Sequence, residues 1–161
     1  MTMRRTPLLV ALLTLPLVLA ACGQGETRDE SGEITTGGDT DVFTIAVGDC
    51  FDDEGDLSGT TEVNSLPTVP CSQAHDNEVY AEYVFPDGDY PGTDAVETTA
   101  TQECLAQWKT FVGLDFEASA LEVYPIYPTQ GSWEQADDRV VSCAIWDPAG
   151  PVTGTLEGAA Y

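Results

Sequence analysis

The pattern of apolar and polar positions predicts one main helix near the middle of the chain. An apolar stripe recurs at intervals of about four residues, as expected for an amphipathic helix, and comprises Val96, Ala100, Cys104, Trp108, Phe111 and Val112. Asp94, with Glu97 three residues later, predicts the start of this helix. Gly113 predicts its end, because glycine readily adopts the left-handed conformation that closes helices.

Other segments carry the pattern of extended chain. Residues 78–85 alternate with period two, and residues 42–51, 139–146 and 152–156 also read as strands. A short helical turn is predicted to open at Ser132, with Gln135 as the partner in a capping box. Strands before and after one long helix predict an α+β domain, with a small, mostly antiparallel sheet packed on the main helix.

The N-terminus reads as an export signal. Arg4 and Arg5 precede an uncharged apolar run, which is typical of a secretory signal peptide over residues 1–21. The motif Leu19-Ala20-Ala21-Cys22 resembles a bacterial lipobox, in which the cysteine receives diacylglycerol and becomes the mature N-terminus. We therefore expect a lipoprotein anchored through Cys22, since more than one acyl chain holds a protein stably at a membrane. An ordinary secretory signal followed by an unrelated cysteine is the alternative.

Composition divides the rest of the chain into two parts. Residues 22–41 contain one large aliphatic residue, Ile34, among glycine, threonine and charged residues, which predicts a flexible acidic linker after the lipidated cysteine. Residues 42–161 carry the periodic patterns described above and are predicted to form one extracytoplasmic domain.

Charge and apolar content exclude several classes of protein. The chain has 28 acidic and 5 basic residues and a formal net charge of −23. Nucleic-acid binding is excluded by this balance, because phosphate neutralisation requires clustered lysine and arginine. With 42% apolar residues the chain is nevertheless able to form a core, so disorder throughout is not expected.

Four cysteines remain after Cys22, and an even number in an exported chain predicts two disulfides. Four cysteines allow three pairings. Cys50–Cys71 would close a local β arch, and Cys104–Cys143 would connect the main helix to a strand, because both side chains fall on predicted core faces.

Residues for catalysis or metal binding are few. His75 is the only histidine, and its neighbour Asp76 would normally point to the other side of a strand. A buried structural histidine is the alternative interpretation. Carboxylates are numerous but form no recognisable hydrolase motif, and the acidic turns at residues 52–56 and 87–92 only partly match a calcium loop. We expect no catalytic residues, no metal site and no cofactor.

Aromatic residues on predicted loops give a better candidate site. Tyr90, Tyr127 and Trp133, with His75 at the edge, form the candidate binding surface, because amphipathic rings on loops favour carbohydrate or protein contacts. Packing of these rings onto a small core is the alternative.

An ordered set of motifs resembles the septum formation domain family of actinobacterial envelope proteins. The motifs are Val47-Gly48-Asp49-Cys50-Phe51, Val69-Pro70-Cys71, His75-Asp76-Asn77-Glu78-Val79-Tyr80, Phe85-Pro86-Asp87-Gly88-Asp89-Tyr90-Pro91-Gly92, Tyr127-Pro128-Thr129, Ser132-Trp133 and the segment 139–143. The resemblance extends over residues 42–156. It implies an extracytoplasmic module, often attached to a membrane anchor, and carries no catalytic residues.

Together these features predict a lipid-anchored, non-catalytic binding module on the extracytoplasmic face of the cell membrane. The expected partners are the membrane, reached through the N-terminal lipid, and an envelope protein or the cell wall. The oligomeric state is left open. An envelope hydrolase that uses carboxylates or His75 is the alternative.

Overall fold

The computed structural model describes residues 25–53 and 62–161, and the predicted signal peptide and Cys22 lie outside these ranges. The elements in chain order are β1 (Thr27–Arg28), β2 (Ile34–Thr36), β3 (Gly38–Asp41), β4 (Cys50–Phe51), β5 (Ser65–Val69), β6 (Ala74–His75), β7 (Asn77–Val84), α1 (Thr93–Val112), the 3-10 helix η1 (Phe116–Ala118), β8 (Glu122–Ile126), α2 (Gln130–Gln135), β9 (Val140–Trp146) and β10 (Val152–Thr153).

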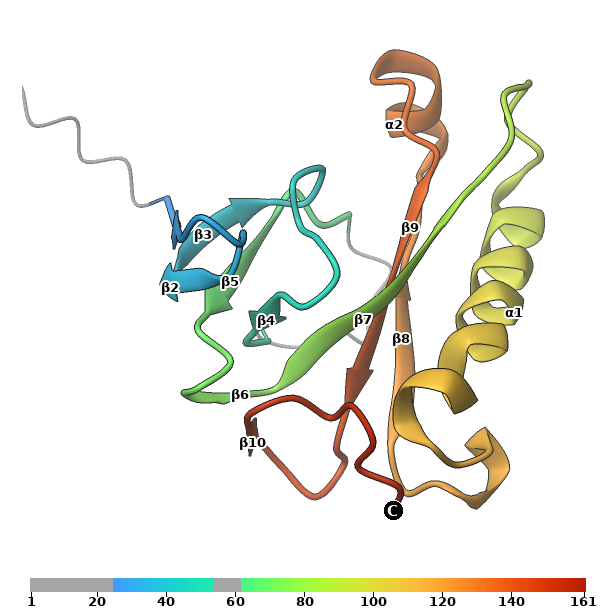
Figure 1. Cartoon of the computed structure of the whole chain (residues 1–161). Helices are drawn as coiled ribbons and strands as arrows, with labels where there is room; N and C mark the ends of the chain where they lie inside the picture. Colours follow the sequence, from blue (N-terminus) through green and yellow to red (C-terminus); the bar gives the residue numbers. More distant parts are fainter. Residues whose placement is uncertain (1–24, 54–61) are drawn as a thin grey trace, which may run out of the picture.

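A curled antiparallel sheet organises the fold (Figure 1). Its six strands follow the order β3-β5-β4-β7-β9-β8, and the long strands β7 and β9 pair from Asn77↔Trp146 to Val84↔Val140. Helix α1 lies along one face of β7, β9 and β8, whereas β3, β4 and β5 curl away on the other side of β7. The α+β prediction is therefore confirmed.

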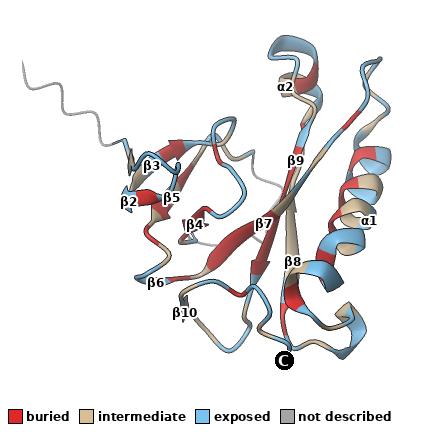
Figure 2. Ribbon diagram, in the orientation of Figure 1, coloured by how far each residue is buried: buried red, intermediate tan, exposed pale blue. Residues whose placement is uncertain are grey.

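The main helix follows the predicted stripe. Its buried residues are Val96, Ala100, Cys104, Trp108 and Val112, all on the side that faces the sheet (Figure 2). Gly113 ends the helix in the left-handed conformation, as predicted, with φ 84°. The predicted capping by Asp94 is wrong, because the N-cap is Gly92, two residues earlier, whose carbonyl accepts from Ala95 N and Val96 N. Asp94 instead lies in the first turn, where its charge favours the helix dipole.

Two apolar clusters lie on the two faces of the sheet. The larger cluster joins α1 to β7 and β9 and contains the edge-to-face pair Tyr80–Trp108 at 5.8 Å between ring centroids. The smaller cluster lies under the curled strands and comprises Ile45, Phe51, Leu66, Val79 and Ala144. Strand β7 supplies Val79 to the smaller cluster and Tyr80 to the larger one. An irregularity in its pairing with β9 between Val79 and Ala81 interrupts the predicted alternation, so Ala81 and Tyr83 also pack against the larger cluster.

Both expected disulfides are present. Cys50–Cys71 connects β4 to the turn after β5, and Cys104–Cys143 connects α1 to β9. Cys104 and Cys143 are fully buried within the larger cluster, so this bond fastens the helix to the sheet at the centre of the core.

The predicted flexible linker is corrected by the structure, since residues 27–41 form β1, β2 and β3. Strand β3 pairs with β5 at one edge of the main sheet, and Thr40 is buried with its hydroxyl 2.6 Å from that of Thr68. Ile34 is also buried. Backbone pairing to an existing sheet edge does not require a continuous apolar pattern, which is why composition alone indicated a linker.

An ion pair fastens the same segment. Both terminal nitrogens of Arg28 donate to the carboxylate of Asp49, at 2.6 and 2.8 Å, and Asp49 is buried. The hydrogen bond to Asp49 and the nearby carboxylate charges raise the pKa of Arg28. The folded part of the chain therefore begins well before residue 42.

Other boundaries differ in detail. Strand β4 covers only Cys50–Phe51 because residues 42–49 form a loop, and β10 is limited to Val152–Thr153. The C-terminal segment after β10 is held by Glu78, whose buried carboxylate accepts from Thr155 Oγ1 at 2.6 Å and from Leu156 N at 2.7 Å. Within the described ranges, no helix has the length and apolar character needed to cross a membrane.

Candidate functional site

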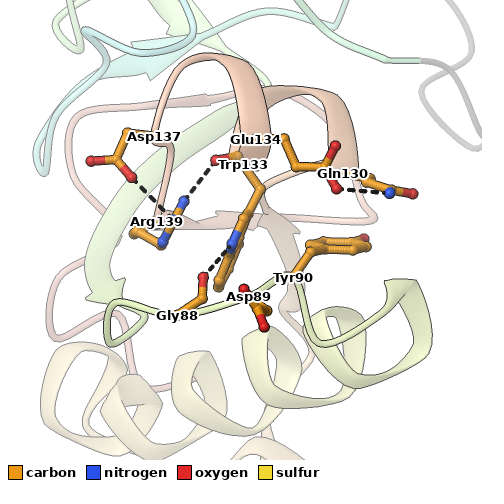
Figure 3. Close-up of a pocket in the computed structure, with 8 residues that line it drawn as sticks. All are labelled: Gly88, Asp89, Tyr90, Gln130, Trp133, Glu134, Asp137 and Arg139. Carbon is orange, nitrogen blue, oxygen red and sulfur yellow. Dashed lines mark hydrogen bonds and ion pairs between the residues drawn. The ribbon is translucent and has the colours of Figure 1, made fainter.

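A surface pocket lies between α2 and the loop that connects β7 to α1 (Figure 3). Its volume is about 450 Å³. It is lined by Gly88, Asp89, Tyr90, Gln130, Trp133, Glu134, Asp137 and Arg139. Two members of the predicted binding surface, Tyr90 and Trp133, therefore belong to one pocket.

The N-terminus of α2 positions the pocket. Thr129 is the N-cap: its hydroxyl accepts from Ser132 N at 3.1 Å, and the Ser132 hydroxyl accepts from Thr129 N at 3.0 Å. The predicted cap at Ser132 with Gln135 as its partner is thus wrong by three residues, because Thr129 is the N-cap and Ser132 is the third helical residue, its partner in the capping box. This reciprocal pairing fixes the turn that carries Trp133 and Glu134.

Trp133 forms the back wall of the pocket and is only 4% exposed. Its indole N–H donates to Gly88 O at 2.9 Å, which joins α2 to the facing loop. The guanidinium of Arg139 lies 3.9 Å from the ring centroid, and Tyr90 packs edge-on at 5.6 Å. Trp133 is therefore a packed structural residue, which leaves the half-buried Tyr90 as the aromatic ring available to a ligand.

Arg139 occupies the floor of the pocket and is held on several sides. One terminal nitrogen donates to Trp133 O at 3.0 Å and Asp138 O at 2.8 Å, and the other lies 3.0 Å from Asp137. Its Nε is buried and has no hydrogen-bond partner among the described residues. Asp137 adopts φ 55°, an uncommon value for a residue other than glycine, so the chain accepts local strain where this ion pair forms.

The pocket carries more negative than positive charge. Asp89, Glu134 and Asp137 contribute carboxylates, whereas Arg139 contributes the cation and is already paired with Asp137. Gln130 donates to Glu134, four residues further along α2, at 2.9 Å. This distribution favours a polar ligand with a positively charged group over an anion.

Tyr127 lies next to this pocket rather than in its lining. It is half-buried, and burial raises the pKa of its hydroxyl, with smaller contributions from Glu97 and the neighbouring Tyr90. The structure thus brings Tyr90, Tyr127 and Trp133 together. The prediction of Trp133 as an exposed loop residue of the binding surface is wrong, because Trp133 is buried in α2 and packs onto the core.

His75 does not belong to this site, and its predicted place at the edge of the binding surface is wrong. It is fully buried in β6, with Nδ1 3.0 Å from Gln73 O, while Nε2 has no hydrogen-bond partner in the part of the chain that the structure describes. Burial follows from the pairing of β6 with β10, which places Val152 opposite His75. A hydrolase that uses His75 would need this imidazole to be accessible to substrate. Its burial therefore does not support the alternative of an envelope hydrolase that acts through His75.

The charged residues that line the pocket were not predicted from the sequence. Arg139 is one of only five basic residues and stands directly before β9, which is a signal that it has a specific acidic or aromatic partner. Gln130 and Glu134 are ordinary exposed residues in the sequence, and nothing in its pattern distinguishes them.

Within residues 25–53 and 62–161, no group of three or more histidine, cysteine, aspartate or glutamate side chains is placed to hold a metal ion. Most of the acidic turn at residues 52–56 lies outside the described residues.

The chain matches the model of one protein family. The model of the septum formation family matches residues 47–158, which is more than half of the sequence, so the chain belongs to this family. No curated protein and no solved structure matches it. The two disulfides indicate an extracytoplasmic, oxidising compartment.

Proposed function

We propose that this chain is a membrane-anchored extracytoplasmic lipoprotein that acts as a non-catalytic binding module of the cell envelope and is linked to septum formation. The family assignment and the disulfides support the compartment and the link to septum formation. The lipobox at residues 19–22 supports the anchor.

The pocket between Tyr90 and α2 carries the binding part of the proposal. Its excess of carboxylates and its one half-buried tyrosine ring suit an ammonium group, which both carboxylates and aromatic faces attract. Such a group occurs on lysine-type side chains of envelope proteins and on amine-bearing peptides of the cell wall. The shared chemistry of the ligand is therefore a peptide amine.

A non-catalytic role agrees with the positions of the reactive side chains among the described residues. The single histidine is buried, and the four cysteines of the domain are in disulfides. Asp89, Glu134 and Asp137 lie on an open surface, without the enclosed pair of facing carboxylates that a glycosidase uses.

Binding of an amine is tested by titrating the purified domain with a lysine-containing pentapeptide and, separately, with soluble peptidoglycan fragments. The side-chain N–H resonances of Trp133 and Arg139 report on the pocket. We expect shifts with the free amines and none after their acetylation. Equal binding of the acetylated probes would contradict the proposal, and a response to only one probe would identify the source of the amine.

Substitution at the pocket should weaken this binding. Tyr90→Ala removes the ring, and Glu134→Gln removes one charge without changing shape, so each should reduce affinity by about three- to tenfold. Glu157→Gln is the matched control, because Glu157 is an exposed acid outside the pocket and its loss should leave affinity unchanged. If Glu157→Gln had the same effect as Glu134→Gln, general charge rather than the pocket would explain binding.

The anchor and the septal link are tested together by imaging a fluorescent fusion of the full chain in dividing cells. The wild-type fusion should concentrate at septa and remain with the membrane on fractionation. Cys22→Ala should leave the membrane fraction, because the site of acylation is lost. A uniform envelope signal would disprove the septal link, and membrane retention of Cys22→Ala would disprove the lipid anchor.

A further inference from the structure

The loop between β3 and β4 exposes apolar side chains in an otherwise acidic protein. Residues 42–48 contain no charged side chain, although the chain as a whole has a net charge of −23. Phe43 is 58% exposed and Val47 is 54% exposed. Two of the large apolar side chains most accessible to solvent therefore lie within five residues of each other.

The loop has a defined conformation that holds these side chains outward. Thr44 N donates to Asp41 O and Gly48 N donates to Val79 O, each at 2.8 Å, so both ends of the loop are fastened to the sheet. Ile45, between the two exposed residues, is buried in the smaller apolar cluster. The exposure of Phe43 and Val47 is thus a feature of the folded loop.

The same loop is joined to the N-terminal segment. Asp49, at the end of the loop, accepts from Ala46 N at 2.9 Å and from Arg28 at 2.6 and 2.8 Å. Arg28 neutralises the carboxylate of Asp49, whereas the exposed carboxylate of Asp41 closes the other end of the loop by accepting from Phe43 N at 2.9 Å. The first strand of the described chain and the apolar loop are therefore held together by one ion pair.

Chain length brings this region close to the predicted anchor. Six peptide units separate Cys22 from Arg28 in the sequence, a span of at most about 20 Å when fully extended. A domain of this size has a diameter of roughly 35 Å. The segment from Cys22 to Arg28 is therefore shorter than the diameter of the domain. An anchor at Cys22 would thus keep the side of the domain that carries Arg28 and Asp49 toward the bilayer.

We propose that residues 42–48 contact the membrane surface that holds the anchor, with Phe43 and Val47 inserted at the boundary between headgroups and acyl chains. This inference rests on the proposed anchoring at Cys22. Apolar side chains gain free energy at that boundary, whereas the acidic surfaces elsewhere are repelled by anionic lipids. The loop thus sets the orientation of the domain and the direction in which the pocket opens.

A second pair of exposed apolar residues provides an internal comparison. Val84 and Val140 lie opposite each other at the far ends of β7 and β9, near α2, and both are exposed. In Figure 1 this end of the sheet lies on the opposite side from the point where the described chain begins. A membrane contact made by any exposed apolar residue would include these two valines.

The test couples the mature chain to a lipid bilayer disc of phosphatidylcholine and phosphatidylglycerol through the thiol of Cys22, since the other four cysteines are in disulfides. A gadolinium chelate on the lipid headgroups attenuates amide signals near the surface. Beyond the segment next to the coupling point, residues 25–28, we expect the greatest loss of signal at residues 42–48 and little loss at Val84 and Val140. Equal loss at the two places, or a greater loss at the valines, would overturn the inference.

Substitution separates this inference from the proposed function. Phe43→Ser with Val47→Ser should abolish the preferential loss at residues 42–48, and Val84→Ser with Val140→Ser should leave it unchanged. All four side chains are exposed, so the fold should be retained, which thermal unfolding checks. Chemical coupling supplies the anchor in every sample, so the signal loss at residues 42–48 does not depend on whether Cys22 is acylated in cells. The amine titration of the pocket is a separate measurement, and its outcome does not depend on the contact between this loop and the membrane.

Discussion

Replacing Cys104 and Cys143 together by alanine is expected to lower the free energy of unfolding by about 4 kcal/mol and Tm by roughly 10–20 °C. The two residues are 39 positions apart in the chain, and a cross-link over a loop of this length restricts the unfolded chain by about that amount. Chemical denaturation, followed by circular dichroism, measures the change.

The matched variant replaces Cys50 and Cys71, which are 21 positions apart. Its loop is shorter, which reduces the expected loss to about 3 kcal/mol. Cys71 is also only half-buried, whereas Cys104 and Cys143 are fully buried in the core. If removal of Cys50–Cys71 lowered the free energy of unfolding more than removal of Cys104–Cys143, neither restriction of the unfolded chain nor burial in the core would explain how these bonds stabilise the domain.

Periodicity predicted the elements that bury a stripe of side chains. Helix α1 and strands β7 and β9 each place apolar residues on a face of the core, so their patterns are visible in the sequence. The pairing of Cys104 with Cys143 followed from the same patterns, because both cysteines fall on the buried faces of a helix and a strand.

The N-terminal strands could not be recognised in the same way. Strand β3 contains glycine, threonine and two aspartates, and it is held by backbone pairing to β5 together with the buried hydroxyl of Thr40. Its partner strand is distant in the sequence, so the local pattern contained no sign of the pairing.

The candidate site was predicted in part. The rings of Tyr90, Tyr127 and Trp133 do come together, but the exposure of each ring depends on neighbours from other elements: Gly88 and Arg139 cover Trp133. His75 was misplaced for a similar reason, since the strand that covers it, β10, is nearly eighty residues further along the chain. Long-range contacts of this kind determine burial and leave no local periodicity.

Replacing Arg28 by alanine is the substitution expected to release the N-terminal strands. The carboxylate of Asp49 has a side-chain exposure of 4% and would lose both guanidinium contacts, retaining the hydrogen bond from Ala46 N. Removing one partner of a buried pair typically costs about 3–5 kcal/mol. Because the side chain of Arg28 is itself 25% exposed and water can partly replace it, the expected loss here is about 2–3 kcal/mol.

Two variants and one local measurement identify the origin of this loss. Arg28→Lys keeps the charge but cannot form both contacts at once, so its loss should be smaller than that of Arg28→Ala but measurable. Arg28→Ala combined with Asp49→Asn removes the unpaired charge and should recover part of the stability. Amide hydrogen exchange should become faster in β2 and β3, while the core of α1 exchanges only with global unfolding. If neither the unfolding free energy nor the exchange of residues 34–41 changed in Arg28→Ala, the segment would be held by its strand pairing alone, and the ion pair would contribute nothing to its stability.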